Sequence, residues 1–150
     1  MSESTEAMSA GRRNALKGMG AAAMLPLLMG ARKGDPAAGP EVVYELRIYH
    51  LNEGKLPLIL KRFHQHEVKI FERLGMTPIA FWTPTDAPDA GRTLVYMLRH
   101  PSRTAADAAW KAFSSDPEWL VVKAESEKDG SFVAKHDHMF LKLTDFSPAP

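Results

Sequence analysis

Three alternating side chains near the start of a predicted strand are the first candidates for chemistry in this sequence. Glu45, Arg47 and Tyr49 occupy every second position of the segment 43–50. Alternate residues of a strand point to the same face, so a carboxylate, a guanidinium and a phenol would stand side by side. Such a set can orient a polar ligand group inside an aromatic pocket, to which we assign Trp82 and Tyr96 of two other predicted strands. The alternative is a structural ion pair at a subunit interface.

A histidine in a predicted helix is the next candidate. The apolar positions of residues 56–74 recur with the helical period of 3.6, but His66 and Glu67 interrupt them after Phe63. An imidazole at such a position can serve as a base or a ligand near neutral pH. It can equally donate to a backbone carbonyl and pack in the core.

Four further histidines suggest a metal site. His50 and His100 end the first and third predicted strands, and His136 and His138 begin the fourth. If the first and third strands run parallel and the fourth antiparallel to the first, all four imidazoles gather at one end of the sheet. Imidazole binds zinc, copper, nickel or iron, whereas histidines at strand ends are more often solvated. We predict no cofactor, and a metal or haem remains an alternative.

Periodicity and capping signals predict the elements that position these residues. Strands are expected at 43–50, 77–83, 93–99 and 136–143, where β-branched and aromatic residues alternate with polar ones. A helix is expected from residue 56 to Gly75. Ser102 is expected to cap a second helix that ends at Ser114, and Asp116 followed by Pro117 to open a third that ends near Lys128.

This order, β-α-β-β-α-β with the second helix split in two, predicts an α+β, ferredoxin-like domain with a four-stranded antiparallel sheet. Helices cover only one face of such a sheet, yet both faces carry large side chains, Phe140 among them. We therefore expect a homodimer in which two sheets close on each other as a dimeric α/β barrel. Because Leu46 and Ile48 suit the helix-packed core, we expect Glu45, Arg47 and Tyr49 to face the partner's sheet.

The ordered set of motifs resembles the NIPSNAP family over nearly all of residues 43–148. The match lies in Tyr44-Glu45-Leu46-Arg47-Ile48-Tyr49, Phe63-x-x-His66, Leu74-Gly75-Met76, Ala80-Phe81-Trp82, Asp116-Pro117-Glu118-Trp119 and the closing Leu143-Thr144-Asp145-Phe146-Ser147-Pro148. The sequence departs from the family pattern at Lys69, where a proline is usual, and at Leu74, where a histidine is common. The resemblance implies a ferredoxin-like subunit that pairs into a dimeric barrel, and it implies no reaction, because the family has no secure general activity.

The first forty residues resemble a twin-arginine export signal. Arg12 and Arg13 precede a weakly apolar run over 18–31 that is too short to cross a bilayer as a helix. We expect residues 1–40 to be a signal peptide and linker recognised by the Tat translocase. Residues 41–150 would then be a mature domain with no stable membrane span, periplasmic or extracellular in location. The alternative is a buried or amphipathic N-terminal helix.

Charge and composition exclude several classes of function. Of 19 basic and 18 acidic residues, five and three lie in 1–40, which leaves 14 and 15 in the mature domain. A nearly neutral domain lacks the basic surface that nucleic acids require. There are no cysteines, so disulfides and thiolate chemistry are excluded.

We expect a module that binds or senses a small hydrophobic or aromatic molecule. An oxygenase or isomerase that uses Arg47, Tyr49, His66 and Trp82, without a cofactor or with haem or metal, is an alternative, as is a protein-interaction module.

Overall fold

The computed structural model describes residues 41–148. The predicted export signal, including Arg12 and Arg13, lies outside this range. The strands are β1 (Val43–Leu51), β2 (Thr77–Trp82), β3 (Thr93–His100) and β4 (Val133–Leu141). The helical elements are α1 (Leu56–Arg62), the π-helical turn η1 (Phe63–Glu67), α2 (Val68–Arg73), α3 (Arg103–Ser114) and α4 (Pro117–Ser126). The α+β class and the split second helical region are as predicted.

The four strands form one antiparallel sheet in the order β2-β3-β1-β4. The predicted four-stranded antiparallel sheet is therefore confirmed, but the expectation that β1 and β3 run parallel is wrong. Glu45 lies opposite Leu98 and His50 opposite Thr93, so β3 runs against β1. A single crossover through α1, η1 and α2 makes β1 parallel to β2, and the β2–β3 hairpin reverses the direction again.

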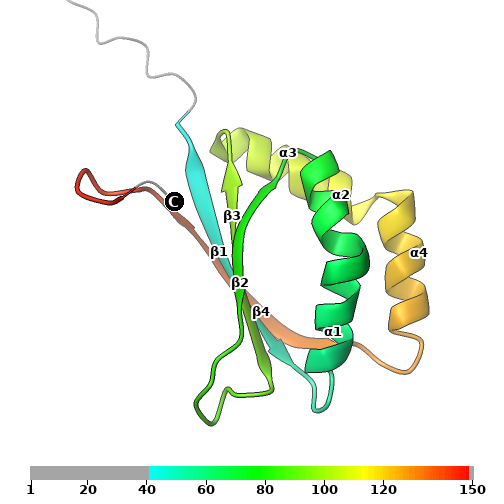
Figure 1. Ribbon diagram of the computed structural model, residues 1–150. Helices are drawn as coiled ribbons and strands as arrows, with labels where there is room; N and C mark the ends of the chain where they lie inside the picture. The colour runs from blue at the N-terminus through cyan, green and yellow to red at the C-terminus, as the bar shows by residue number, and fades with distance from the viewer. Residues whose placement is uncertain (1–40, 149–150) are drawn as a thin grey trace, which may run out of the picture. The chain divides into compact units, whose positions relative to one another are not determined.

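All the helices lie on one face of the sheet, as Figure 1 shows. The core between the two layers is rich in aromatic side chains, and Phe71 and Tyr96 are fully buried at its centre. Phe71 stacks on Tyr96 with ring centroids 6.1 Å apart. Burial of such large aromatic side chains stabilises the fold.

Both predicted capping residues of the split helical region have their expected role. Ser102 accepts a hydrogen bond from the backbone N–H of Ala105 at 3.1 Å and begins α3. Asp116 accepts one from the N–H of Trp119 at 3.0 Å and begins α4. These side chains satisfy amide groups that have no partner within the helix.

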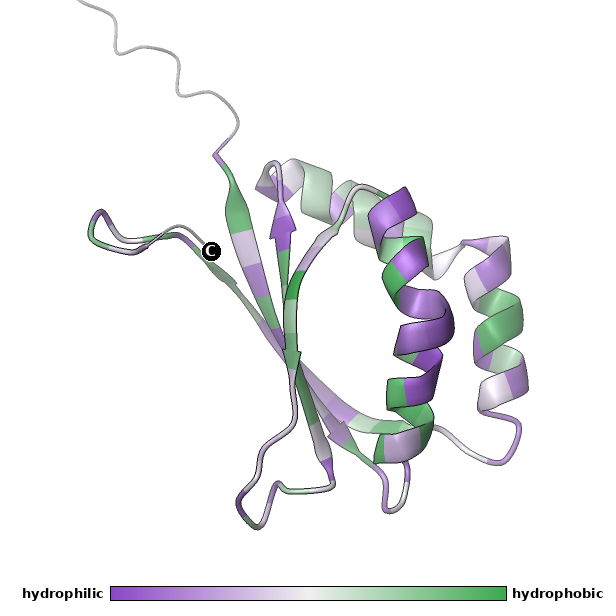
Figure 2. Cartoon of the chain, viewed as in Figure 1, coloured by the Kyte–Doolittle hydropathy of each residue, from purple (hydrophilic) through white to green (hydrophobic). Residues whose placement is uncertain are grey.

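The first helical segment changes its hydrogen-bonding pattern between α1 and α2. The five residues of η1 form a π-helical turn, and Figure 2 shows that the middle of this segment is mostly hydrophilic. A π turn accommodates an additional residue in a helix and is frequent at functional sites. As a result Glu67, which interrupts the apolar pattern of the sequence, lies inside the protein with 2% of its surface exposed.

In Figure 1 no helix of the described residues covers the other face of the sheet, which we call the bare face. Trp82 of β2 and Met139 of β4 are about half exposed there, at 48% and 49%. The register places Leu46 and Ile48 on the same face, opposite Met139 and Asp137. Within residues 41–148, no helix is long and apolar enough to cross a membrane.

A candidate ligand pocket beneath the helices

The polar set of β1 faces the helices, contrary to our expectation that it faces a partner's sheet. Glu45 contacts Trp110 of α3, and the Tyr49 ring lies 6.2 Å from that of Phe63 in η1. The expectation was wrong because it assigned Leu46 and Ile48 to the helix-packed core, whereas they lie on the other face of the sheet. Partners from distant parts of the chain make this burial possible.

Glu45 is the centre of a buried hydrogen-bond cluster. One carboxylate oxygen accepts hydrogen bonds from Nε1 of Trp110 at 2.6 Å and from Nε2 of His100 at 2.9 Å. The other accepts from Arg47 at 2.8 Å. Burial raises the pKa of Glu45, but these hydrogen bonds outweigh it and hold the pKa below its usual value. Glu45 is therefore a fixed anion that anchors the Arg47 guanidinium.

Arg47 is held in place but keeps free hydrogen-bond donors. Its guanidinium carbon lies 4.0 Å from the centroid of the Trp110 ring, in a cation–π contact. One terminal nitrogen is bonded to Glu45, and the buried Nε atom has no partner within the described residues. A guanidinium has five N–H groups in a fixed plane, so Arg47 can still donate to a ligand oxygen.

A tyrosine pair adds a further donor. The Tyr96 hydroxyl donates to the Tyr49 oxygen at 2.8 Å. Tyr96 is completely buried, so this bond satisfies its only donor, while the hydroxyl hydrogen of Tyr49 remains available. Burial raises the pKa of both phenols, so both stay protonated at neutral pH.

The π turn contributes a carboxyl group to the same region. Oε1 of Glu67 accepts a hydrogen bond from Nε of Arg62 at 2.6 Å. Arg62 also donates to Glu127, at 2.8 Å, and its guanidinium lies over the rings of Trp119 and Phe132. Burial raises the pKa of Glu67 to about 7, against the opposing effect of Arg62. The Arg62 guanidinium is shared by the carboxylates of Glu67 and Glu127. Its positive charge therefore only partly offsets the cost of burying a negative charge on Glu67.

These groups meet at one small cavity between the sheet and α4, which we call the inner pocket. Its volume is about 180 Å³. Its polar walls include Arg47, Tyr49, Arg62, Glu67 and His136, and its apolar walls include Phe113 and Trp119. A cavity of about 150 Å³ can hold benzene, so the inner pocket has room for one small ring with polar substituents.

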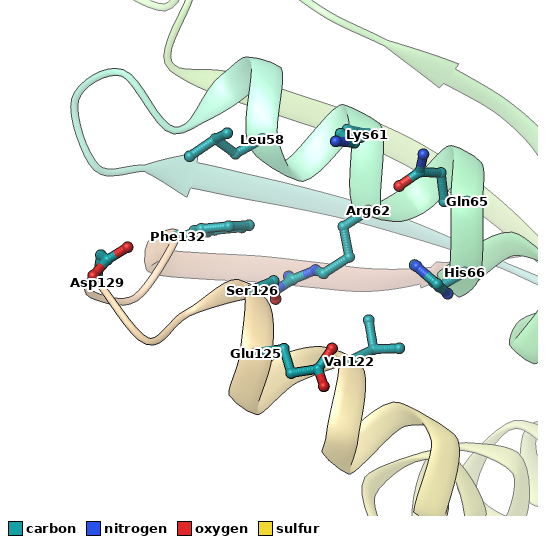
Figure 3. A pocket seen from close by; sticks show the side chains of 10 residues that line it. All are labelled: Leu58, Lys61, Arg62, Gln65, His66, Val122, Glu125, Ser126, Asp129 and Phe132. Atoms are coloured by element: carbon teal, nitrogen blue, oxygen red, sulfur yellow. The ribbon is translucent and has the colours of Figure 1, made fainter.

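A second cavity, which we call the outer groove, lies between α1–η1 and α4 and is shown in Figure 3. Its volume is about 370 Å³. The figure shows His66 and Arg62 directed from the first helical segment toward α4, with Leu58 and Phe132 at the other end. Arg62 also lines the inner pocket, so the two cavities share this side chain. His66 thus lies beside the outer groove, away from the polar set of β1.

Trp82 lies apart from both cavities. It is exposed on the bare face of the sheet, at a register position opposite Val95. Of the six predicted pocket residues, the inner pocket therefore brings together Arg47 and Tyr49, with Glu45 and Tyr96 directly behind them. The residues of the inner pocket that were not predicted from the sequence include Arg62, Glu67 and Trp119. Glu67 had a recognisable signal, since it breaks the apolar stripe four residues after Phe63.

The four histidines do not gather, so that part of the metal hypothesis is wrong. His100 is buried at one end of β3, next to Val43, whereas His50 lies at the opposite end of β1. His136 and His138 share the helix-covered face, opposite Tyr49 and Arg47. His50 points to the bare face, where it bonds to Asp137 at 3.0 Å. Residues 41–148 contain no group of three side chains placed to hold a metal ion.

Comparison with known proteins gives a consistent assignment of fold. The NIPSNAP family model matches residues 44–148. A NIPSNAP family protein from Agrobacterium tumefaciens is similar in structure, with a TM-score of 0.62, 20% identity and coverage of 73% of this chain and 100% of the other. An uncharacterised NIPSNAP domain protein from Burkholderia xenovorans has a TM-score of 0.60, 19% identity and coverage of 71% and 99%. No curated protein matches the sequence.

Proposed function

The chain belongs to the NIPSNAP family, and from this starting point we propose that it binds a small, ring-bearing molecule with polar oxygen atoms in the inner pocket. The observation that carries the proposal is the combination of unused donors and aromatic walls in one cavity. Arg47 and Tyr49 line the cavity and offer N–H and O–H groups, while Phe113 and Trp119 offer flat apolar surfaces. Sites of this composition bind small molecules, since a few polar groups fix the orientation of a ligand in an apolar cavity.

The charges around the pocket favour a ligand that is neutral or carries one negative charge. Arg47 is balanced by Glu45, and Arg62 and Lys123 are balanced by Glu67 and Glu127. A cationic ligand would meet an arginine on either side of the cavity. An oxygen acceptor would instead suit the guanidinium of Arg47, which lines the cavity and has N–H groups beyond the one bonded to Glu45.

The proposed assembly is a homodimer formed through the bare face of the sheet. Half-exposed Trp82 and Met139 belong to an apolar surface of a kind that monomeric proteins seldom leave uncovered. Pairing of two such faces would bury these side chains and leave the inner pocket, on the helix side, in each subunit. We also propose that the protein acts outside the cytoplasm after Tat export, on the basis of Arg12 and Arg13.

The proposal is tested by ligand-observed NMR on the full-length protein with 2-indanone, a flat bicyclic ketone of suitable size. We expect saturation transfer to the probe, and we expect the affinity to fall by about fivefold in Tyr49→Phe, which removes one hydrogen-bond donor of roughly 1 kcal/mol. Tyr44→Phe, on the other face of β1, is the matched control and should bind as the wild type does. Equal binding by all three proteins would contradict the inner pocket as the site.

A further inference from the structure

Glu67 is a buried acidic group whose hydrogen-bonding capacity is only partly used. Its Oε1 atom accepts from Arg62, and no hydrogen bond involves its Oε2 atom within residues 41–148. The residue is 2% exposed and forms part of the wall of the inner pocket, together with Tyr49 and Arg47. It belongs to a π turn, and π turns are frequent at functional sites.

We propose that Glu67 is a general base that takes a proton from a carbon atom adjacent to a carbonyl group of the bound molecule. This inference rests on the proposed ligand pocket and adds a reaction to it, the interconversion of a ketone and its enol. The class of substrate is a small cyclic or aryl-substituted ketone with an acidic C–H bond.

The step balances without a cofactor or a co-reactant. The Glu67 carboxylate takes the proton, and the electron pair of the C–H bond becomes the second bond of a carbon–carbon double bond. The electron pair of the carbonyl double bond moves to oxygen and gives an enolate. Return of the proton from Glu67 to that oxygen gives the enol, and its return to the original carbon restores the ketone. No atom is oxidised or reduced.

The hydrogen-bond donors Tyr49 and Arg47 can stabilise the negative charge that develops on the ligand oxygen during this step. As the proton moves to Glu67, negative charge moves from its carboxylate to the ligand oxygen, where Tyr49 and Arg47 can donate hydrogen bonds. The total charge of the pocket does not change. Donors fixed in advance stabilise such an oxyanion more than mobile water does, and here Tyr96 and Glu45 fix them.

The surroundings of Glu67 also suit a base that works near neutral pH. The charged and titratable groups around it are Arg62 from α1, Arg47, Tyr49 and Tyr96 from the sheet, and Glu127 after α4. Lys123 of α4 and His136 of β4 line the same cavity. Burial raises the pKa of Glu67 to about 7, and a general base is most effective when its pKa lies near the working pH.

The test is exchange of the C–H hydrogens of 2-indanone for deuterium in D₂O, followed by proton NMR with the full-length protein. We expect exchange above the buffer background and a loss of at least about 100-fold in Glu67→Gln, the size of a general-base contribution. Binding of the probe, measured separately by saturation transfer, should persist in this variant. The wild-type rate should rise with pH as a single group with a pKa near 7 loses its proton.

The control variant is Glu125→Gln, which removes an exposed carboxylate beside the outer groove and should exchange the probe at the wild-type rate. Binding without exchange above background would overturn the role of Glu67 and leave the ligand pocket intact. Equal exchange by wild type and Glu67→Gln would also overturn it. Absence of binding by the wild type would contradict both the inference and the proposed function. Circular dichroism establishes that each variant is folded.

Discussion

Replacement of Glu67 by glutamine should change how the stability of the protein depends on pH. Burial raises the pKa of this carboxyl group from 4.5 to about 7 in the folded protein. Between these two values the folded state holds a proton that the unfolded state has lost. The unfolding free energy of the wild type therefore falls as pH rises through this window. Glutamine does not titrate, so the variant lacks this contribution.

The expected size follows from the same two pKa values. At 1.36 kcal/mol per pKa unit, a change from 4.5 to about 7 corresponds to about 3 kcal/mol. Glutamine can still accept a hydrogen bond from Arg62, so we expect the remaining difference between the proteins to be nearly independent of pH. The stabilising proton is fully present below pH 4.5, and its effect is lost above pH 7.

Urea denaturation of the full-length wild type and of Glu67→Gln, at intervals from pH 4 to pH 8, measures this effect. The unfolding free energy of the variant minus that of the wild type should increase by about 3 kcal/mol across the range. Glu125→Gln, which changes an exposed carboxylate, should give a flat difference. A flat difference for Glu67→Gln, or a decrease with rising pH, would refute the argument that burial outweighs the Arg62 ion pair.

Three further changes test the packing and the assembly. Glu45→Ala leaves a buried guanidinium and two buried N–H groups without their acceptor and should lower the unfolding free energy by about 3–5 kcal/mol, measured by urea denaturation. Glu53→Ala, at an exposed position, should stay within about 0.5 kcal/mol of the wild type. Ser102→Ala removes the cap of α3 and should cost about 1 kcal/mol, whereas Ser102→Asp should retain most of the stability; equal losses would contradict the capping role. Met139→Lys places a charge on the bare sheet face and should shift sedimentation velocity from dimer to monomer, while Leu120→Lys, on exposed α4, should remain dimeric.

Local signals in the sequence were sufficient to predict the helices and strands of the fold. The alternation in 43–50 predicted β1, and the capping residues Ser102 and Asp116 located both helices of the split region. The caps are hydrogen bonds between neighbours in sequence, and the alternation of a strand reflects side chains that point to opposite faces, so a single segment contains the information. The ends of β4 were less well predicted, because the strand begins at Val133 and the polar run from 135 to 138 conceals its alternation.

Local signals could not show which side chains of the sheet face the helices and which face away from them. Whether Glu45 can be buried depends on His100 and Trp110, which lie 55 and 65 positions away. Nothing in the segment around Glu45 shows that these partners exist. The error over the histidines has a different origin, since the direction of β3 follows from the chain path through the helical crossover and the hairpin. The burial of Glu67 beside the inner pocket depends on both a three-dimensional arrangement and a π turn that helical periodicity does not predict.

The most direct test of a ligand site in the inner pocket is a crystal structure of the protein soaked with a set of small ring-bearing ketones and phenols. We predict electron density between β1 and α4, with an oxygen atom of the bound compound within hydrogen-bond distance of Tyr49 or Arg47 and its ring against Trp119. An inner pocket that stays filled by water in every soak, with compounds bound only in the outer groove or on the sheet surface, would contradict the account.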